Sequence, residues 1–80
     1  MKFIKSRRKA GWISVEDALP KESGVYLVAT RYGAVFLTHY SSVHQLFNAH
    51  DHYTAEQARI YAFDGVRYWM PAPEPPEELR

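Results

Sequence analysis

The residues of this chain best suited to chemistry are its four histidines, which all lie in the stretch HYSSVHQLFNAHDHY. Neutral imidazole is a common zinc ligand, and a tetrahedral site needs three or four donors. The stretch matches no established zinc spacing. Its histidines are expected on a strand and on different sides of a helix, so their rings should point in different directions. We therefore predict no cofactor and keep metal binding as a third alternative, with the candidate ligands His39, His44, His50, His52 and Asp51.

Hydroxyl and carboxylate side chains elsewhere are explained by helix capping. Ser14 is followed by two acidic residues, which favour the first turn of a helix. Ser42 and Thr54 are each followed three positions later by a glutamine, which is the capping-box pattern. The sequence contains no nucleophile elbow and no phosphate-binding glycine loop. We therefore predict that the protein is not an enzyme.

Positive charge is concentrated at the start of the chain. The first nine residues carry five basic side chains, whereas the remainder has a net charge of −4. Such an arm could neutralise phosphates, so the first alternative function is nucleic-acid binding, aided by base stacking on exposed tyrosines. A solvated terminus explains the same residues, because the rest of the chain is acidic. The basic residues are Lys2, Lys5, Arg7, Arg8 and Lys9.

Composition predicts three segments. Residues 1–11 form the basic arm, residues 12–72 one globular domain, and residues 73–80 a tail rich in proline and glutamate. The chain has no cysteine, which favours a reducing, intracellular setting. It also lacks an apolar run of the roughly 20 residues that would span a bilayer. We therefore expect a cytoplasmic protein without a membrane partner.

The stretch VYLVATRYGAVFLTHY predicts a β-hairpin, in which residues 25–30 and 34–40 are joined by a three-residue loop. Gly33 ends this loop, where a left-handed backbone conformation is needed. This places Val28 opposite Phe36, so one face of the hairpin is aliphatic and the other aromatic. The aliphatic residues are Val25, Leu27, Ala29, Val35 and Leu37.

The second half of the chain predicts two short helices and a second hairpin. Apolar residues recur at helical spacing over residues 43–50, and a shorter helix is expected at residues 55–59. Residues 60–69 contain an Asp-Gly pair, a strong hairpin signal, which would place Tyr61 opposite Tyr68. The expected fold class is α+β: a small antiparallel sheet of about four strands, made of two hairpins, with one or two short helices packed on one face.

Six aromatic residues gather on one side if the two hairpins share a sheet. A short helix cannot cover both faces of such a sheet, so apolar surface should remain for a partner, either a host protein or a second copy of the chain. Tyrosine-rich surfaces suit protein interfaces, although the same rings would also serve as a core. The predicted partner-binding residues are Tyr26, Phe36, Tyr40, Tyr61, Phe63 and Tyr68.

Two stretches near the ends of the domain carry a family resemblance. WISVEDALP at residues 12–20 and WMPAPEPP at residues 69–76 resemble the opening and closing signature of a family of uncharacterised phage and prophage proteins, domain of unknown function 551. The resemblance implies a phage or prophage accessory protein and supplies no catalytic residue. Together with the expected surface, it leads us to predict a non-enzymatic protein that binds a host protein, for example to inhibit a defence system such as CRISPR-Cas.

Overall fold

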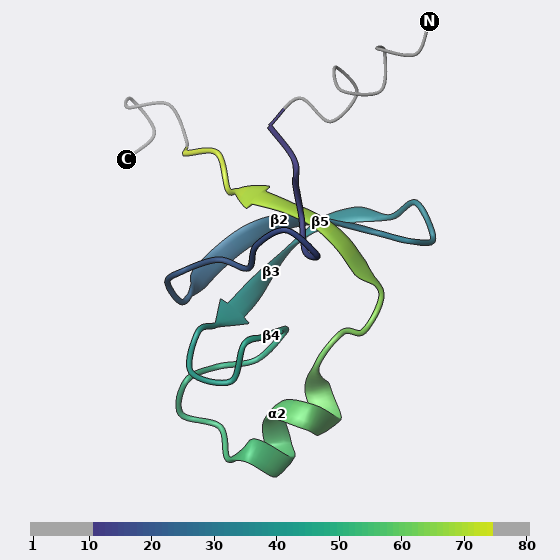
Figure 1. The fold of residues 1–80 in the computed structure, drawn as a ribbon. Helices are drawn as coiled ribbons and strands as arrows, with labels where there is room; N and C mark the ends of the chain where they lie inside the picture. Colours follow the sequence, from purple (N-terminus) through teal and green to yellow (C-terminus); the bar gives the residue numbers. More distant parts are fainter. Residues whose placement is uncertain (1–10, 75–80) are drawn as a thin grey trace, which may run out of the picture.

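The computed structural model of the protein describes residues 11–74 (Figure 1). Within this range, five strands form one antiparallel sheet in the order β1-β5-β2-β3-β4, and a short helix connects β4 to β5. The predicted basic arm up to residue 10 and the tail beyond Glu74 lie outside the described residues. The elements are β1 (Ile13–Ser14), β2 (Gly24–Thr30), β3 (Val35–Ser41), β4 (Leu46–Phe47), α2 (Ala55–Tyr61) and β5 (Val66–Pro71).

The hairpin of β2 and β3 has the predicted register. Val28 lies opposite Phe36. The N–H of Thr30 donates to the carbonyl oxygen of Ala34 at 2.9 Å, which closes the three-residue loop. Gly33 has a φ of +90°, where any side chain would be strained. The glycine therefore fixes the loop, and the loop decides which residues face the core.

The second predicted hairpin does not form, and the sheet has five strands rather than about four because the short strands β1 and β4 join it. Strand β5 pairs with β2 instead of with residues 60–63, so Trp69 lies opposite Val28. Tyr61 belongs to the helix and does not face Tyr68. An isolated hairpin is marginally stable, whereas β5 gains a central strand as its partner and buries Trp69. This tertiary gain outweighs the local turn preference of the Asp-Gly pair.

The helix predicted at residues 43–50 is also wrong. The segment makes a tight turn into β4, and Phe47 lies opposite Tyr40 of β3. Gln45 and Asn48 have φ angles of 58° and 64°, which lie outside the range of a right-handed helix. The rings of Phe47 and Tyr40 are buried, with their centroids 4.7 Å apart. Packing of Phe47 into the core therefore outweighs the helical spacing of the apolar residues and sets the conformation of this segment.

Replacing Gln45 with glycine is expected to raise the free energy of unfolding by about 0.5–1 kcal/mol, because a left-handed conformation costs an L-residue roughly 1–2 kcal/mol that glycine avoids in part. Urea denaturation followed by circular dichroism measures this change. Arg59→Gly in helix α2 is the control, and it should lose about 1 kcal/mol. A comparable loss in Gln45→Gly would contradict the turn and favour the helix.

Helix α2 begins at the predicted residue, Ala55, but it does not pack on a face of the sheet as predicted. The N–H of Gln57 donates to the Thr54 hydroxyl, and the Gln57 side chain accepts from the N–H of Thr54, which is the expected capping box. The helix lies beyond β4 at the edge of the sheet (Figure 1) and buries Ala58. Such a small apolar stripe cannot cover a sheet face, so the prediction of helices packed on one face is wrong. Within residues 11–74, no helix has the length and apolar character needed to cross a membrane.

The core lies on one face of the sheet and is covered by the connection between β1 and β2. This connection crosses the sheet in Figure 1, and its side chains Val15 and Leu19 pack against the core. The indole Nε1 of Trp69 donates to the carbonyl oxygen of Ala18 at 2.9 Å, which ties β5 to the connection. A loop thus covers the core side of the sheet, where the sequence predicted a helix. The buried centre of the core consists of Val28, Tyr40, Phe47 and Trp69.

Candidate interaction surface

The face of the sheet opposite the core is aliphatic and exposed. Successive residues of a strand point to opposite faces, so the residues between the core positions of β2 and β3 lie on this side. Val25, Val35 and Leu37 expose 48%, 57% and 56% of their surface. We call this surface the open face. Its residues are Val25, Leu27, Ala29, Val35 and Leu37, the aliphatic set expected from the sequence.

A partner that covers the open face would gain binding free energy from the hydrophobic effect. Full burial of a valine or leucine side chain is worth roughly 1.5–3 kcal/mol, and the three half-exposed side chains have gained only part of this on folding. Contiguous apolar surface on a small domain marks an interaction site more often than scattered apolar residues do. His39 lies on the same side as Leu37 and bounds the patch, since its ring packs against His50. The open face is therefore the best-defined candidate for partner binding.

Four of the six aromatic residues predicted to bind a partner belong to the core side. Tyr26 and Phe36 pack against the buried core, and Tyr40 has no exposed surface. Phe63 extends this group at its border: its ring packs edge-on against Phe36 with the centroids 5.3 Å apart, and 41% of its surface stays exposed. These rings therefore support the sheet from the covered side.

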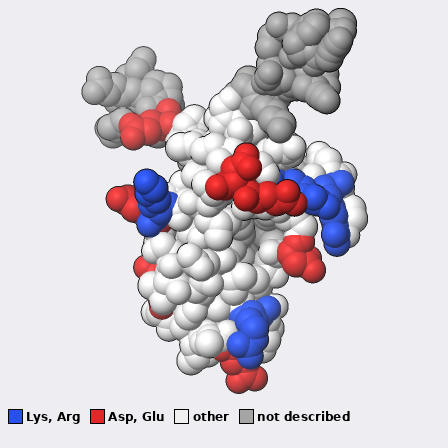
Figure 2. All heavy atoms as spheres, viewed as in Figure 1, with Lys and Arg blue, Asp and Glu red and all other residues white. Residues whose placement is uncertain are grey.

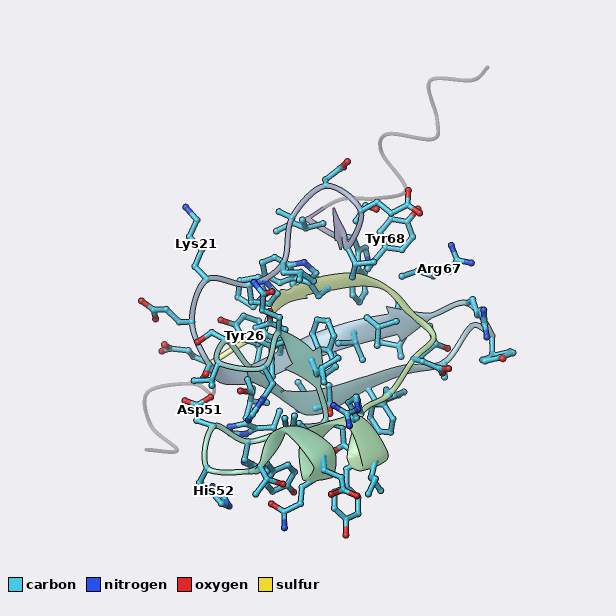
Figure 3. All side chains as sticks on the ribbon, turned by 60° about the horizontal axis from the view of Figure 1, so that its bottom comes forward. Lys21, Tyr26, Asp51, His52, Arg67 and Tyr68 are labelled. Carbon is cyan, nitrogen blue, oxygen red and sulfur yellow. The ribbon has the colours of Figure 1, made fainter. Side chains whose placement is uncertain are left out.

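The other two aromatic residues lie elsewhere. Tyr68 is opposite Ala29 in the sheet and so projects on the side of the open face, whereas the exposed Tyr61 ends α2 near Tyr53. Figure 3 shows Tyr68 beside Arg67, far from the histidine segment. The six side chains do not gather on one surface, because that arrangement required the second hairpin. The alternation of β2 and β3 was the signal that could have selected the aliphatic face instead.

The histidine segment forms a cluster of rings. The rings of His39 and His50 lie 4.2 Å apart between centroids, and His52 lies 5.6 Å from His50, so the expectation that these rings diverge is wrong. Tyr53 packs edge-on against His50 and His52. His44 is engaged separately, with its Nε2 2.9 Å from the carbonyl oxygen of Tyr53. Over residues 11–74, no three His, Asp or Glu side chains are placed to hold a metal ion.

Asp51 fastens the histidine segment to the sheet. Its Oδ1 accepts hydrogen bonds from the hydroxyls of Ser23 at 2.6 Å and Ser41 at 2.7 Å. These bonds hold the pKa of the Asp51 carboxyl below its usual value, with a smaller contribution from His39 and His44. Ser41 is fully buried and its proton is donated to the carboxylate, so it is not an accessible nucleophile. These hydrogen bonds therefore hold the histidine segment against the sheet.

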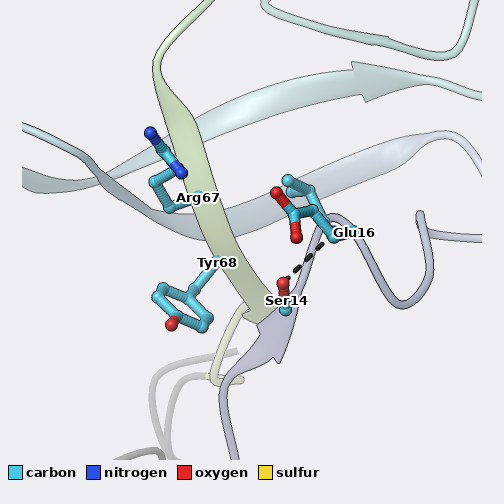
Figure 4. Close-up of a pocket in the computed structure, with 5 residues that line it drawn as sticks. Ser14, Glu16, Arg67 and Tyr68 are labelled. Carbon is cyan, nitrogen blue, oxygen red and sulfur yellow. Dashed lines mark hydrogen bonds between the residues drawn. The ribbon is translucent and has the colours of Figure 1, made fainter.

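A shallow hollow of about 130 Å³ lies between β1 and β5 (Figure 4). The N–H of Val15 donates to the carbonyl oxygen of Arg67 at 3.0 Å along its wall. The Ser14 hydroxyl accepts from the N–H of Glu16 at 3.2 Å, which is the predicted cap. Pockets for small molecules usually enclose roughly 300–1,000 Å³. This hollow is smaller than that range.

Charged side chains are scattered over the described part of the protein. Residues 11–74 contain four Lys/Arg and seven Asp/Glu, a net charge of −3. Figure 2 shows these side chains as separate patches around a largely uncharged surface, with no continuous basic stripe on the face in view. Nucleic-acid sites need clustered cations, so this part of the chain offers phosphates little attraction.

These features define a small α+β domain with a one-sided core and, within residues 11–74, an aliphatic sheet face on which Val25, Val35 and Leu37 are about half exposed. The chain belongs to the family Protein of unknown function (DUF551), whose model matches residues 11–77, and this confirms the resemblance seen at the two ends of the domain. The comparisons with curated proteins and with solved structures gave no match. The family signature serves the scaffold, because Pro20 and Trp69 are buried and Trp12 is half-buried.

Proposed function

We propose that this protein is a non-enzymatic accessory protein of a bacteriophage or prophage that binds a host protein in the bacterial cytoplasm. The observation that carries the proposal is the open face, where Val25, Val35 and Leu37 are about half exposed. A phage or prophage origin is what the resemblance to the family implied. A domain of this size acts most economically by occupying the surface of a larger host protein. Inhibition of a defence complex such as CRISPR-Cas is the specific form that we propose.

The chemistry of the open face suits a protein partner. Stable interfaces bury about 800 Å² per partner, with an apolar centre and a polar rim. The open face supplies the apolar centre, and the tyrosine and histidine side chains at its borders supply polar groups for a rim, namely Tyr68 and His39. Rigid strands hold these side chains in place, so little conformational entropy is lost on binding.

A lysine at Val25 tests the proposal. Val25→Lys places a charge on the open face without entering the core, and it should weaken binding of the host protein at least about tenfold, or 1.4 kcal/mol. Ile60→Lys is the matched control, because Ile60 is 66% exposed on α2, outside the open face. The measurement is quantitative affinity capture with the three baits from host lysate, followed by calorimetric titration of the captured protein. A host protein that binds wild type and Val25→Lys equally would contradict the proposal.

The anti-defence form has its own measurement. Cells that carry a CRISPR-Cas system directed at a test phage are plated with the phage while they express wild type, Val25→Lys or Ile60→Lys. Wild type and Ile60→Lys should restore plaques, and Val25→Lys should not. If none of the three restores plaques although the host protein is still captured, binding stands and the target is not this defence system.

A second candidate function is nucleic-acid binding, which the five basic residues among the first nine favour. The test is a gel-shift titration of the full chain and of a chain lacking residues 1–9 at two salt concentrations. Binding that falls steeply with salt and disappears on truncation would favour this function. Equal behaviour of the two chains would contradict it.

A further inference from the structure

Within residues 11–74, the outer edge of strand β3 is unpaired over residues 35–38. Strand β4 pairs with its last two residues, and the N–H of Asn48 donates to the carbonyl oxygen of His39 at 2.6 Å. Among the described residues, no strand pairs with this edge over residues 35–38. In Figure 1, the end of the β2–β3 hairpin projects from the side of the molecule, and β4 lies beside the other end of β3.

The free backbone groups of this edge belong to Val35 and Leu37. Thr30 and Ala34 form a hydrogen-bonded pair of the β2–β3 ladder, because the N–H of Thr30 donates to the carbonyl oxygen of Ala34. Bonded pairs alternate along an antiparallel ladder, so Phe36 also bonds to β2. The N–H and C=O groups of Val35 and Leu37 therefore point away from β2. Their chemical complement is the backbone of another extended strand.

The edge lacks the features by which natural sheets avoid such pairing. Edge strands are usually protected by charged side chains, by proline or by a bulge. The segment AVFLT at residues 34–38 contains no charge and no proline. The ladder of β2 and β3 shows no bulge between residues 24 and 40. The side chains of Val35 and Leu37 are also more than half exposed, so a strand that docks here gains apolar contacts as well as hydrogen bonds.

We propose that the strand that docks on this edge is β3 of a second copy of the chain. An antiparallel pair with its two-fold axis at Phe36 places Val35 of each copy opposite Leu37 of the other, so the outward groups of both residues are used. Because the segment is uncharged, the symmetry brings no like charges together. The overlap covers residues 34–38 and ends where β4 begins to pair with β3 at His39.

The dimer goes beyond the proposed function and does not depend on it. Edge pairing joins the two sheets into one and sets the two open faces side by side on the same surface. The aliphatic area offered to a third protein is then roughly doubled. A host protein could still bind one open face if the chain were a monomer, so the two proposals fail independently.

Sedimentation equilibrium and amide hydrogen exchange test the dimer on the wild-type chain. At high protein concentration the mass should rise from 9.3 kDa toward twice that value. Exchange of the Val35 and Leu37 amides should slow at least about tenfold between dilute and concentrated samples. The inward amides of β2 serve as the reference, since they are bonded in both states. A mass of 9.3 kDa at all concentrations up to about 1 mM would overturn the proposal, as would a dimer in which the Val35 and Leu37 amides exchange unchanged.

Val35→Pro tests the same edge by removing one outward N–H. Proline is tolerated at the first residue of an edge strand, and the change should weaken the dimer at least about tenfold. Val25→Lys is the control, because Val25 lies on β2 and should leave the dimer intact. A dimer lost in Val25→Lys and kept in Val35→Pro would place the interface on the open face and overturn edge pairing. Protection of the two amides that appears only after a host protein is added would assign the edge to a foreign strand and overturn the second copy.

Discussion

Replacing Trp69 with alanine is expected to lower the free energy of unfolding by about 3–5 kcal/mol. Trp69 exposes 8% of its surface and lies opposite Val28 at the centre of the sheet. Its ring meets the Tyr26 ring edge-on with the centroids 5.4 Å apart, and its Nε1 donates to Ala18. Domains of this kind have stabilities of about 5–15 kcal/mol, so a large share of the total would be lost. Urea denaturation followed by far-ultraviolet circular dichroism measures the change.

Two variants separate the causes of this loss. Trp69→Phe keeps an aromatic ring but removes the indole N–H, so it should cost less than Trp69→Ala while leaving the Ala18 carbonyl without its donor. Trp12→Ala removes the half-buried tryptophan of the same family signature and should cost less still. A loss below about 1 kcal/mol in Trp69→Ala would show that the covering connection does not depend on this side chain.

The sequence predicts those elements whose signals are local and complete. The β2–β3 hairpin follows from the position of Gly33, and the start of α2 follows from the Thr54 capping box. The two failures have a common cause, because in both a local pattern competes with burial in the core. Residues 43–50 have helical spacing, yet Phe47 is held against Tyr40. No local pattern shows that β5 would pair with β2, since this contact joins residues about forty positions apart.

The sequence predicted only part of the candidate surface, because which face is buried depends again on tertiary packing. Alternation along β2 and β3 assigned the aliphatic and aromatic residues to opposite faces correctly. Which face is covered depends on the connection of residues 15–23, whose side chains Val15 and Leu19 fill the space above the aromatic side. The Ser14 turn predicts a short helical element there but gives no sign of its direction. The sequence therefore defined the two faces, and the tertiary structure decided which of them is left for a partner.

Tyr40 is the position where removal of one atom and removal of a whole side chain should have opposite effects. The side chain is fully buried, and its hydroxyl has no hydrogen-bond partner within the described residues. Tyr40→Ala should lower the free energy of unfolding by about 3–5 kcal/mol, because a large cavity opens in the core. Tyr40→Phe should leave the free energy of unfolding unchanged or raise it by about 1 kcal/mol, because an unsatisfied polar group is removed. Tyr26→Phe is the control, since the Tyr26 hydroxyl donates to the carbonyl oxygen of Glu22 at 2.8 Å and its loss should be destabilising.

The pH dependence of stability gives an independent measurement of the same hydroxyl. Burial raises the pKa of Tyr40, and the neighbouring Tyr26 raises it further. A raised pKa means that the unfolded chain loses this proton at a lower pH than the folded chain does. The stability of wild type should therefore fall as the pH rises above about 10, the ordinary value for tyrosine, and this part of the fall should be absent in Tyr40→Phe. Parallel urea titrations at pH 7 and above pH 10 compare the two chains. An identical fall in both chains would mean that the pKa of Tyr40 is not raised in the folded protein. A Tyr40→Phe chain less stable than wild type at pH 7 would mean that the Tyr40 hydroxyl is hydrogen-bonded in solution.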